Sequence, residues 1–268
     1  MKNKYKSMNK VDLCGTVVYF KEFDFKTFKK ATVGVKDNNL DSVCYFDIFQ
    51  NNGLKYNKQK TTLATLKKKF MDSDGKMLNT RIHCYGSIEE NHYTTRNGEV
   101  RTDQKPIVFN IFEALGTDDY NIFRLDGIVD LIKPIKDGKE LKVRLKQVVG
   151  KWDKNIGEET RVLKTIDLIT EDEEIIDKLD GLDNGEYVSL EGYFINQISK
   201  STSHFTKAGS EGTSKNKHGM YIKNIVKFNE NFDSDKYFNI EKSESTPHKD
   251  DKDSNDDPFV DDLDDLDF

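Results

Sequence analysis

One arrangement of strand residues occurs twice in this sequence, and no other feature limits the possible folds as much. The pattern Leu-x-Gly-x-Val occupies 13–17 and returns at 125–129. The pattern Ile-x-Cys-x-Gly-x-Ile at 82–88 has the counterpart Val-x-Leu-x-Gly-x-Phe at 188–194. The two glycines lie 71 residues apart in the first copy and 65 in the second. Matches in the same order at similar spacing indicate two copies of one structural unit.

Within the first copy, apolar and polar residues alternate with a period of two, which predicts strands. The expected strands are 11–20, 31–36, 43–49, 81–88 and 107–112. Between the third and the fourth, Leu63, Leu66 and Phe70 recur at helical spacing behind Thr61, a residue that can cap a helix. The second copy has its helix candidate at 173–182. The predicted order in each copy is therefore three strands, a helix and two strands.

A glycine inside a strand suits a small closed barrel, because the missing Cβ relieves crowding where strands coil or bend. Together with the helix after the third strand, this predicts a mainly β chain with two tandem five-stranded OB-fold barrels, over 9–115 and 120–232. The alternative is that these are ordinary strand glycines of an unrelated β-sandwich. From Glu241 onward the apolar pattern stops, so we expect 241–268 to be a disordered acidic tail.

The net charge of −6 is unevenly distributed along the chain. Residues 1–115 hold 20 Lys and Arg against 13 Asp and Glu, a net of +7, whereas 241–268 hold 12 Asp and Glu against 3 Lys, a net of −9. Residues 116–240 are mildly acidic. A basic first unit and a strongly acidic tail predict a polyanionic partner and a segment of the chain that competes with it.

Aromatic and basic residues are interleaved in the first unit, as nucleic-acid binding by stacking and charge requires. Five rings and four lysines fall within 19–30, which we expect to be the first inter-strand loop. In the third strand, Cys44, Phe46 and Ile48 share an apolar face, which leaves Tyr45 and Phe49 on the outside. A polar loop is expected over 91–101, and the only Trp lies at 151–154 beside two lysines. The candidate DNA contacts are Tyr19, Lys21, Phe23, Lys26, Lys29, Lys30, Tyr45, Phe49, Tyr93, Arg96, Arg101, Lys151, Trp152 and Lys154.

Each candidate has a structural alternative. Phe23 and its neighbouring rings can form a small core at the barrel mouth, and Tyr45 and Phe49 can pack against the second barrel. Trp152 can equally cover a barrel mouth. Lysines in loops are commonly only solvated.

Residues 9–115 resemble the bacterial single-stranded DNA-binding protein family. The likeness lies in the apolar third strand at 44–51, in Gly86 of the fourth strand, and in Tyr93 seven residues later, ahead of Asn97-Gly98. The stacking Trp of that family falls near Val43 here, a departure for which Tyr45 on the same face can substitute. The chain has two predicted barrels and is rich in Lys, Asn, Asp and Ile. In both respects it is more similar to a phage-encoded member of that family than to a bacterial housekeeping one.

The tail also resembles that family, whose acidic C-terminal segment docks on replication and repair proteins through a terminal Phe. The matching residues are Asp264, Asp265, Leu266, Asp267 and Phe268, with Asp267 in place of the usual Pro. The resemblance implies capture of the ring and the α-carboxylate by a partner. A purely solubilising tail is the alternative.

Other functions find little support in the sequence. Cys14, Cys44 and Cys84 have no metal-ligand or disulfide spacing, which favours a reducing compartment. No catalytic, P-loop or cofactor motif occurs, so we expect no enzyme activity, no cofactor and no metal. The basic N-terminus has no apolar core, and we expect a cytoplasmic protein without a membrane segment.

The sequence therefore predicts a protein that coats single-stranded DNA as a monomer or homodimer. The alternatives are a protein-interaction adaptor that imitates nucleic acid, and a single-stranded RNA binder.

Overall fold

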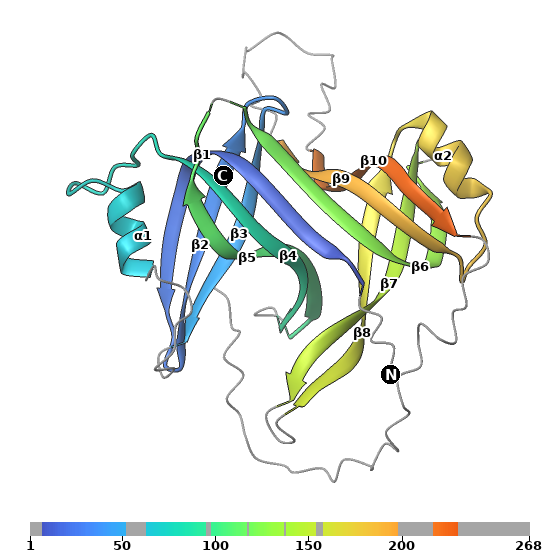
Figure 1. Ribbon diagram of the computed structural model, residues 1–268, viewed down its shortest axis with the longest axis horizontal. Coiled ribbons are helices and arrows are strands. Elements are labelled where there is room, and N and C mark those ends of the chain that lie inside the picture. The colour runs from blue at the N-terminus through green and yellow to red at the C-terminus, as the bar shows by residue number, and fades with distance from the viewer. Residues whose placement is uncertain are drawn as a thin grey trace.

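Ten strands and two short helices form the described part of the chain, in a computed structural model (Figure 1). The structure describes residues 7–51, 63–94, 98–116, 118–136, 138–153, 158–197 and 217–229. The elements are β1 (Asn9–Asp24), β2 (Phe28–Asp37), β3 (Ser42–Asn51), α1 (Leu63–Phe70), β4 (Arg81–Thr94), β5 (Val100–Glu113), β6 (Tyr120–Ile135), β7 (Glu140–Asp153), β8 (Glu158–Thr170), α2 (Glu173–Asp180), β9 (Tyr187–Gln197) and β10 (Lys217–Asn229). The prediction of a mainly β chain is confirmed.

The first five strands pair in a closed ring. β1 pairs with β2, β2 with β3, β3 in parallel with β5, β5 with β4, and β4 again with β1. Apolar side chains fill the interior, including Leu63, Leu66 and Phe70, which are the buried face of α1. The spacing that predicted this helix is thus the spacing of its core contacts.

The second five strands repeat this pairing, in the order β6, β7, β8, β10, β9 and back to β6, and β10 again runs parallel to β8. The repeated glycines occupy equivalent places. A Cβ added to Gly15 would lie 2.2 Å from the Lys36 carbonyl oxygen, and one added to Gly127 would lie 2.7 Å from that of Lys146. No side chain fits at either position, which gives the sequence repeat its physical reason.

The two five-strand units meet where β1 pairs antiparallel with β6, so that one sheet runs through both units (Figure 1). This pairing has an approximate two-fold symmetry at the level of single side chains. Asn9 donates to the Ile88 carbonyl and accepts from the Ile88 amide, both at 2.8 Å. Asn121, its counterpart in the second unit, makes the same two bonds with Phe194 at 2.8 and 3.1 Å.

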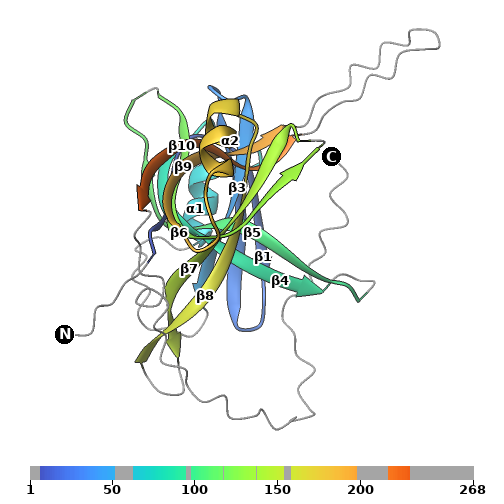
Figure 2. The ribbon, with the colours of Figure 1, turned by 90° about the vertical axis from the view of Figure 1, so that its right-hand side faces the viewer.

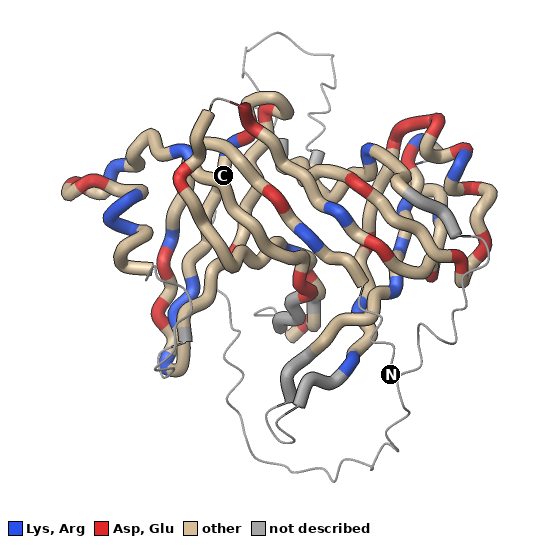
Figure 3. Tube along the Cα trace, in the orientation of Figure 1, with Lys and Arg blue, Asp and Glu red and all other residues tan. Residues whose placement is uncertain are grey.

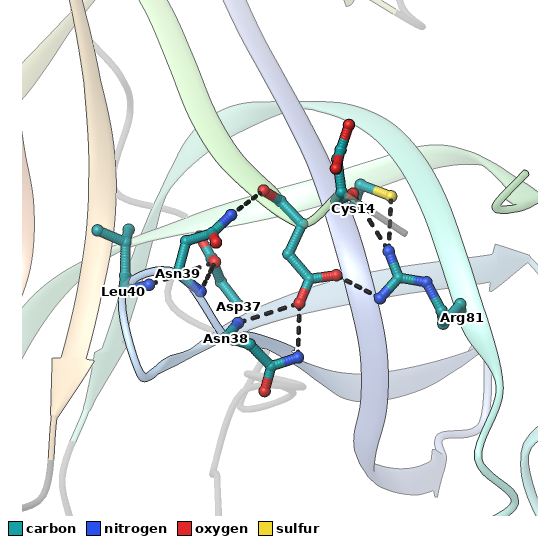
Figure 4. Close-up of polar contacts among 8 residues, drawn as sticks. Cys14, Asp37, Asn38, Asn39, Leu40 and Arg81 are labelled. Carbon is teal, nitrogen blue, oxygen red and sulfur yellow. Dashed lines mark hydrogen bonds and ion pairs between the residues drawn. The ribbon is translucent and has the colours of Figure 1, made fainter. Parts of the chain in front are cut away.

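The turn after β2 holds Asp119, which lies between β5 of the first unit and β6 of the second (Figure 4). The Asn38 amide and side chain donate to Asp119 at 3.1 and 2.6 Å, and the Asn39 side chain donates to the Asp119 carbonyl at 2.6 Å. Arg81 forms an ion pair with the same carboxylate. Burial tends to raise the pKa of Asp119, but the hydrogen bonds from Asn38 and Arg81 outweigh it and the pKa is lowered. Asp119 is therefore charged at neutral pH.

Two predicted loops are wrong, because the strands extend through them. β1 continues to Asp24 and β2 begins at Phe28, so the predicted loop at 19–30 is mainly a hairpin, closed by the Phe25 amide on the Phe28 carbonyl at 2.9 Å. The predicted loop at 91–101 is likewise mostly strand, since β4 and β5 pair as far as Thr94 and Val100. Figure 2 shows the β4–β5 and β7–β8 hairpins pointing away from the body on opposite sides.

Candidate nucleic-acid interface

The outer surface of β1, β2 and β3 carries a set of aromatic rings. Directly paired residues of a sheet share a face, and here Tyr19 pairs with Gly34 and Gly34 with Tyr45. Four residues further along the strands, Phe23 pairs with Lys30 and Lys30 pairs with Phe49, so these side chains lie on the same face. We call this surface the ring face; its aromatic members are Tyr19, Phe23, Phe28, Tyr45 and Phe49.

The opposite side of β3 is the core side. Cys44, Phe46 and Ile48 are buried, while Tyr45 and Phe49 are only partly buried. The predicted division of this strand into an inner and an outer face is confirmed. Neither the Tyr45 ring nor the Phe49 ring belongs to the buried core of the first unit.

Gly34 makes room for the two tyrosines of the ring face. The Tyr19 and Tyr45 rings meet edge to face, with centroids 5.7 Å apart. A Cβ at position 34 would lie 2.9 Å from the Tyr45 ring and 2.9 Å from the Tyr19 Cβ. Burial raises the pKa of both phenols, so both are uncharged at neutral pH and do not repel a phosphate.

The phenylalanines form the outer end of the ring face. The Phe28 ring stacks on Phe25 at 4.6 Å and contacts Phe49 at 5.8 Å. The ammonium groups of Lys21 and Lys30 each lie 5.1 Å from the centre of the Phe23 ring, within the range of cation–π attraction. Positive charge and aromatic surface are therefore combined on one face.

The predicted lysines differ in accessibility. Lys21 and Lys26 are exposed, and Lys29 forms an ion pair with Asp24 at 3.0 Å. Lys30 is only 4% exposed and faces Asp47 at 3.9 Å. The Lys30 ammonium group thus lies between the Phe23 ring and the buried Asp47 carboxylate, and its role as a DNA contact stays a prediction.

Asp47 is the charged centre of the ring face and was not among the predicted site residues. Lys105 of β5 approaches it to 3.1 Å, and the Thr32 hydroxyl donates to it at 2.7 Å. Two ammonium groups thus share one carboxylate. The sequence contained only a weak signal for this cluster, namely an acidic residue on the outer side of an otherwise apolar strand.

Other predicted contacts cannot be placed as side chains. Tyr93 and Arg101 are paired across the β4–β5 hairpin, and Lys151 and Trp152 lie on β7, but the structure describes only their backbone. Arg96, Lys154 and the tail residues 264–268 lie outside the described residues. These positions remain predictions.

The second unit has different chemistry at the equivalent positions. Leu131, Arg144 and Asp167 are paired across β6, β7 and β8 where the first unit has Tyr19, Gly34 and Tyr45. Arg144 donates to both Asp167 oxygens, at 2.6 and 3.1 Å, and Lys142 lies 2.7 Å from the same carboxylate. Burial tends to raise the pKa of Asp167, yet Arg144 and Lys142 outweigh this and lower it. An ion cluster thus replaces the tyrosine pair.

A cavity of about 650 Å³ lies between the two units, and we call it the junction cleft. One wall comes from β3, β4 and β5 and includes Tyr45; the other comes from β6 to β10. Two sets of hydrogen bonds join the units beside it. The Gln104 side-chain amide donates to the Thr165 carbonyl at 3.1 Å and accepts from the Asp167 main-chain N–H at 2.9 Å. The Asn196 main-chain N–H donates to the Ser42 hydroxyl at 2.8 Å.

Charge is spread over both units instead of being concentrated in one basic region. Figure 3 shows lysines and arginines interspersed with acidic residues along the chain trace. In the part of the chain that the structure describes, no group of His, Cys, Asp and Glu side chains is arranged to hold a metal ion. Nor does any described helix have the length and apolarity needed to cross a membrane.

No family model matches the chain, and no curated protein matches it in sequence. Solved structures to which it is similar include the single-stranded DNA-binding protein from Thermus aquaticus, which is 13% identical with a TM-score of 0.46 and matches 72% of this chain and 87% of that one. The Plasmodium falciparum SSB complex with ssDNA is 20% identical over 33% of this chain and 82% of that one, with a TM-score of 0.26. A small single-stranded DNA-binding protein from Streptomyces coelicolor is 13% identical over 40% of this chain and 89% of that one, with a TM-score of 0.24.

Proposed function

We propose that this chain is a non-catalytic protein that binds single-stranded DNA with little sequence preference, through the ring face of its first unit. The observation that carries the proposal is the row-by-row placement of Tyr19, Tyr45, Phe23 and Phe49 on one outer surface, with Lys21 against a ring. Soluble proteins have little reason to gather this many rings on the outside of a strand surface unless something covers them.

The chemistry of the ring face suits unpaired bases. A base stacked on an aromatic side chain contributes on the order of 1–3 kcal/mol, and every base offers a π-face, so the sequence of the strand matters little. Lysines beside the rings would contact the phosphates between successive bases. Uncharged phenols add contact area without repelling those phosphates.

The proposed architecture is two OB-folds in tandem, over 9–115 and 120–232. The support is the cyclic pairing of five strands in each unit, with a helix after the third strand, which is the connectivity of that barrel. In OB-folds the surface of the second and third strands takes the oligonucleotide. The ring face occupies this place in the first unit.

We assign the acidic segment 241–268 a separate role, recruitment of replication, recombination or repair proteins. Its 12 acidic residues and its apolar Leu263, Leu266 and Phe268 suit a partner with a basic-rimmed hydrophobic pocket. The same charge would compete with DNA for the basic residues of the first unit. Removal of the segment should then tighten DNA binding at low salt.

The test is a titration of fluorescent poly-dT with the intact chain and with a chain shortened after Ile240, each at two salt concentrations. We expect affinity to fall with salt, by about 0.7 in log K per log salt for each phosphate contact. The shortened chain should bind more tightly at low salt. Negligible binding by both forms would reject the proposal and favour a protein-interaction adaptor. Stronger binding of poly-rU than of poly-dT would instead indicate an RNA-binding protein.

A further inference from the structure

The junction cleft has the features of a second binding site on the path of the strand. Resting on the proposed function, we propose that it takes one unstacked base of the bound DNA, with Tyr45 as the stacking ring, so that a single strand runs from the first unit onto the second. The ring face alone would not predict this, because it lies wholly on the first unit.

Tyr45 is the point of continuity between the two surfaces. Its ring meets Tyr19 on the ring face at 5.7 Å, and the same residue lines the junction cleft. A strand stacked along the ring face therefore reaches the opening of the cleft without leaving aromatic surface. The next wall that it meets belongs to the second unit.

The size and the apolar lining of the cleft suit a flat ring. Its volume of about 650 Å³ lies inside the range of about 300–1,000 Å³ that is usual for small-molecule sites. Val43 and Pro106 of the first unit face Ile135, Ile169 and Met220 of the second. A base inserted here would have apolar contacts on the side away from Tyr45.

The charges of the cleft favour a base over a phosphate. Its cationic lining residues, Lys105, Lys142 and Arg144, are matched by three carboxylates, those of Glu90, Asp103 and Asp167. The cations are also engaged already, Lys105 with Asp47 and the other two with Asp167. A phosphate would have to displace these ion pairs, whereas a neutral base with donors and acceptors on its edge fits a lining of both signs.

Hydrogen bonds between the two units also fix the shape of the cleft. The hydrogen bonds of Gln104 to β8 and of Asn196 to Ser42 join the two units beside it. A site that is already formed spends little binding energy on ordering its walls. This favours a defined base position over a chance gap between two units.

The experiment fills the cleft from the wall of the second unit. Ile169→Trp adds a ring where the base would lie, and Val226→Trp is the matched control, because Val226 is an exposed residue of β10 that does not line the cleft. Each full-length variant is titrated with fluorescent oligo-dT of about 32 nucleotides, twice the upper site size of one OB-fold. We expect Ile169→Trp to weaken binding about fivefold or more, the lower limit for one stacked base, and Val226→Trp to bind like the wild type.

A double-variant cycle shows whether the effect comes from the proposed base. In a Tyr45→Ala background the base has lost its stacking ring, so Ile169→Trp should weaken binding little further. Independent, multiplying losses would overturn the proposal, as would unchanged or tighter binding by Ile169→Trp. Thermal unfolding checks that each variant is folded, and Ile169→Phe replaces Trp if the larger ring lowers the melting temperature.

The failure of this inference is distinguishable from failure of the proposed function. Phe23 belongs to the ring face and does not line the cleft. If Phe23→Ala weakens binding while Ile169→Trp does not, the ring face binds DNA and the cleft does not. If the wild type does not bind the oligonucleotide at all, the proposed function itself is wrong.

Discussion

Replacement of Gly34 by alanine tests whether the sheet surface sets the position of the tyrosine rings. The new methyl group would lie 2.9 Å from both the Tyr19 Cβ and the Tyr45 ring, and 3.1 Å from a Val43 methyl carbon. Ordinary carbon contacts are about 3.5–4.0 Å, so at least one neighbour must move by about half an ångström or more. The Tyr45 ring can turn aside, whereas relief of the contact with the Tyr19 Cβ requires the backbone of β1 or β2 to shift. Overpacking of this kind costs about 1–3 kcal/mol.

Chemical denaturation and oligo-dT titration measure the two consequences of Gly34→Ala. We expect a loss of about 1–3 kcal/mol in the free energy of unfolding and weaker DNA binding, because Tyr45 no longer lies in its stacking position. Gly181→Ala is the matched control: Gly181 has a negative φ of −81° and nothing within 4 Å of its added Cβ, so no loss is expected. Wild-type stability and affinity for Gly34→Ala would refute the reasoning.

Three further outcomes follow from named contacts. Asp119→Asn should lower the free energy of unfolding by about 1.5–3 kcal/mol. Because the pKa of Asp119 is lowered in the folded state, the stability that its charge contributes is complete above the unfolded pKa of about 3.8 and is lost as the pH falls through the folded pKa. In acid denaturation the variant should therefore lose less stability below about pH 4 than the wild type. Asn9→Ala and Asn121→Ala should lower the free energy of unfolding by similar amounts, about 1–3 kcal/mol each, because each leaves one buried main-chain N–H and C=O without their partner. Clearly unequal melting temperatures would show that the two asparagines are not equivalent. Lys21→Gln should reduce the salt slope of DNA binding by about 0.7, whereas Lys30→Gln should mainly lower stability, which salt titrations and denaturation of both variants separate.

The residues that alternate or repeat were predictable from sequence. The period of two in β3 identified Tyr45 and Phe49 as outward-facing, and the helical spacing of Leu63, Leu66 and Phe70 identified α1. The two glycine motifs indicated two copies of one unit, because a backbone carbonyl fills the place of the missing Cβ in both. These features depend on local geometry, which the order of residues records directly.

The lengths of the hairpins and the state of the lysines were not predictable in the same way. The segment 19–30 has the composition of a basic loop, yet β1 and β2 pair through it as far as Asp24 and Lys29, which also form an ion pair at 3.0 Å. Lys30 is buried because Asp47, 17 positions later, lies beside it only after β2 and β3 pair. The junction cleft has walls from eight strands, and no local pattern records their meeting.

The most direct test of the central claim removes rings from the ring face and from another surface in parallel. Tyr19→Ala/Phe23→Ala takes two rings from the ring face. Tyr85→Ala/Phe112→Ala takes two rings that are 41% and 53% exposed and lie on β4 and β5, off the ring face. Both double variants and the wild type are titrated with the same fluorescent oligo-dT at one salt concentration. We predict at least a tenfold loss of affinity for the first, from about 1–3 kcal/mol per stacked base, and near-wild-type binding for the second; equal affinities for all three would contradict the account.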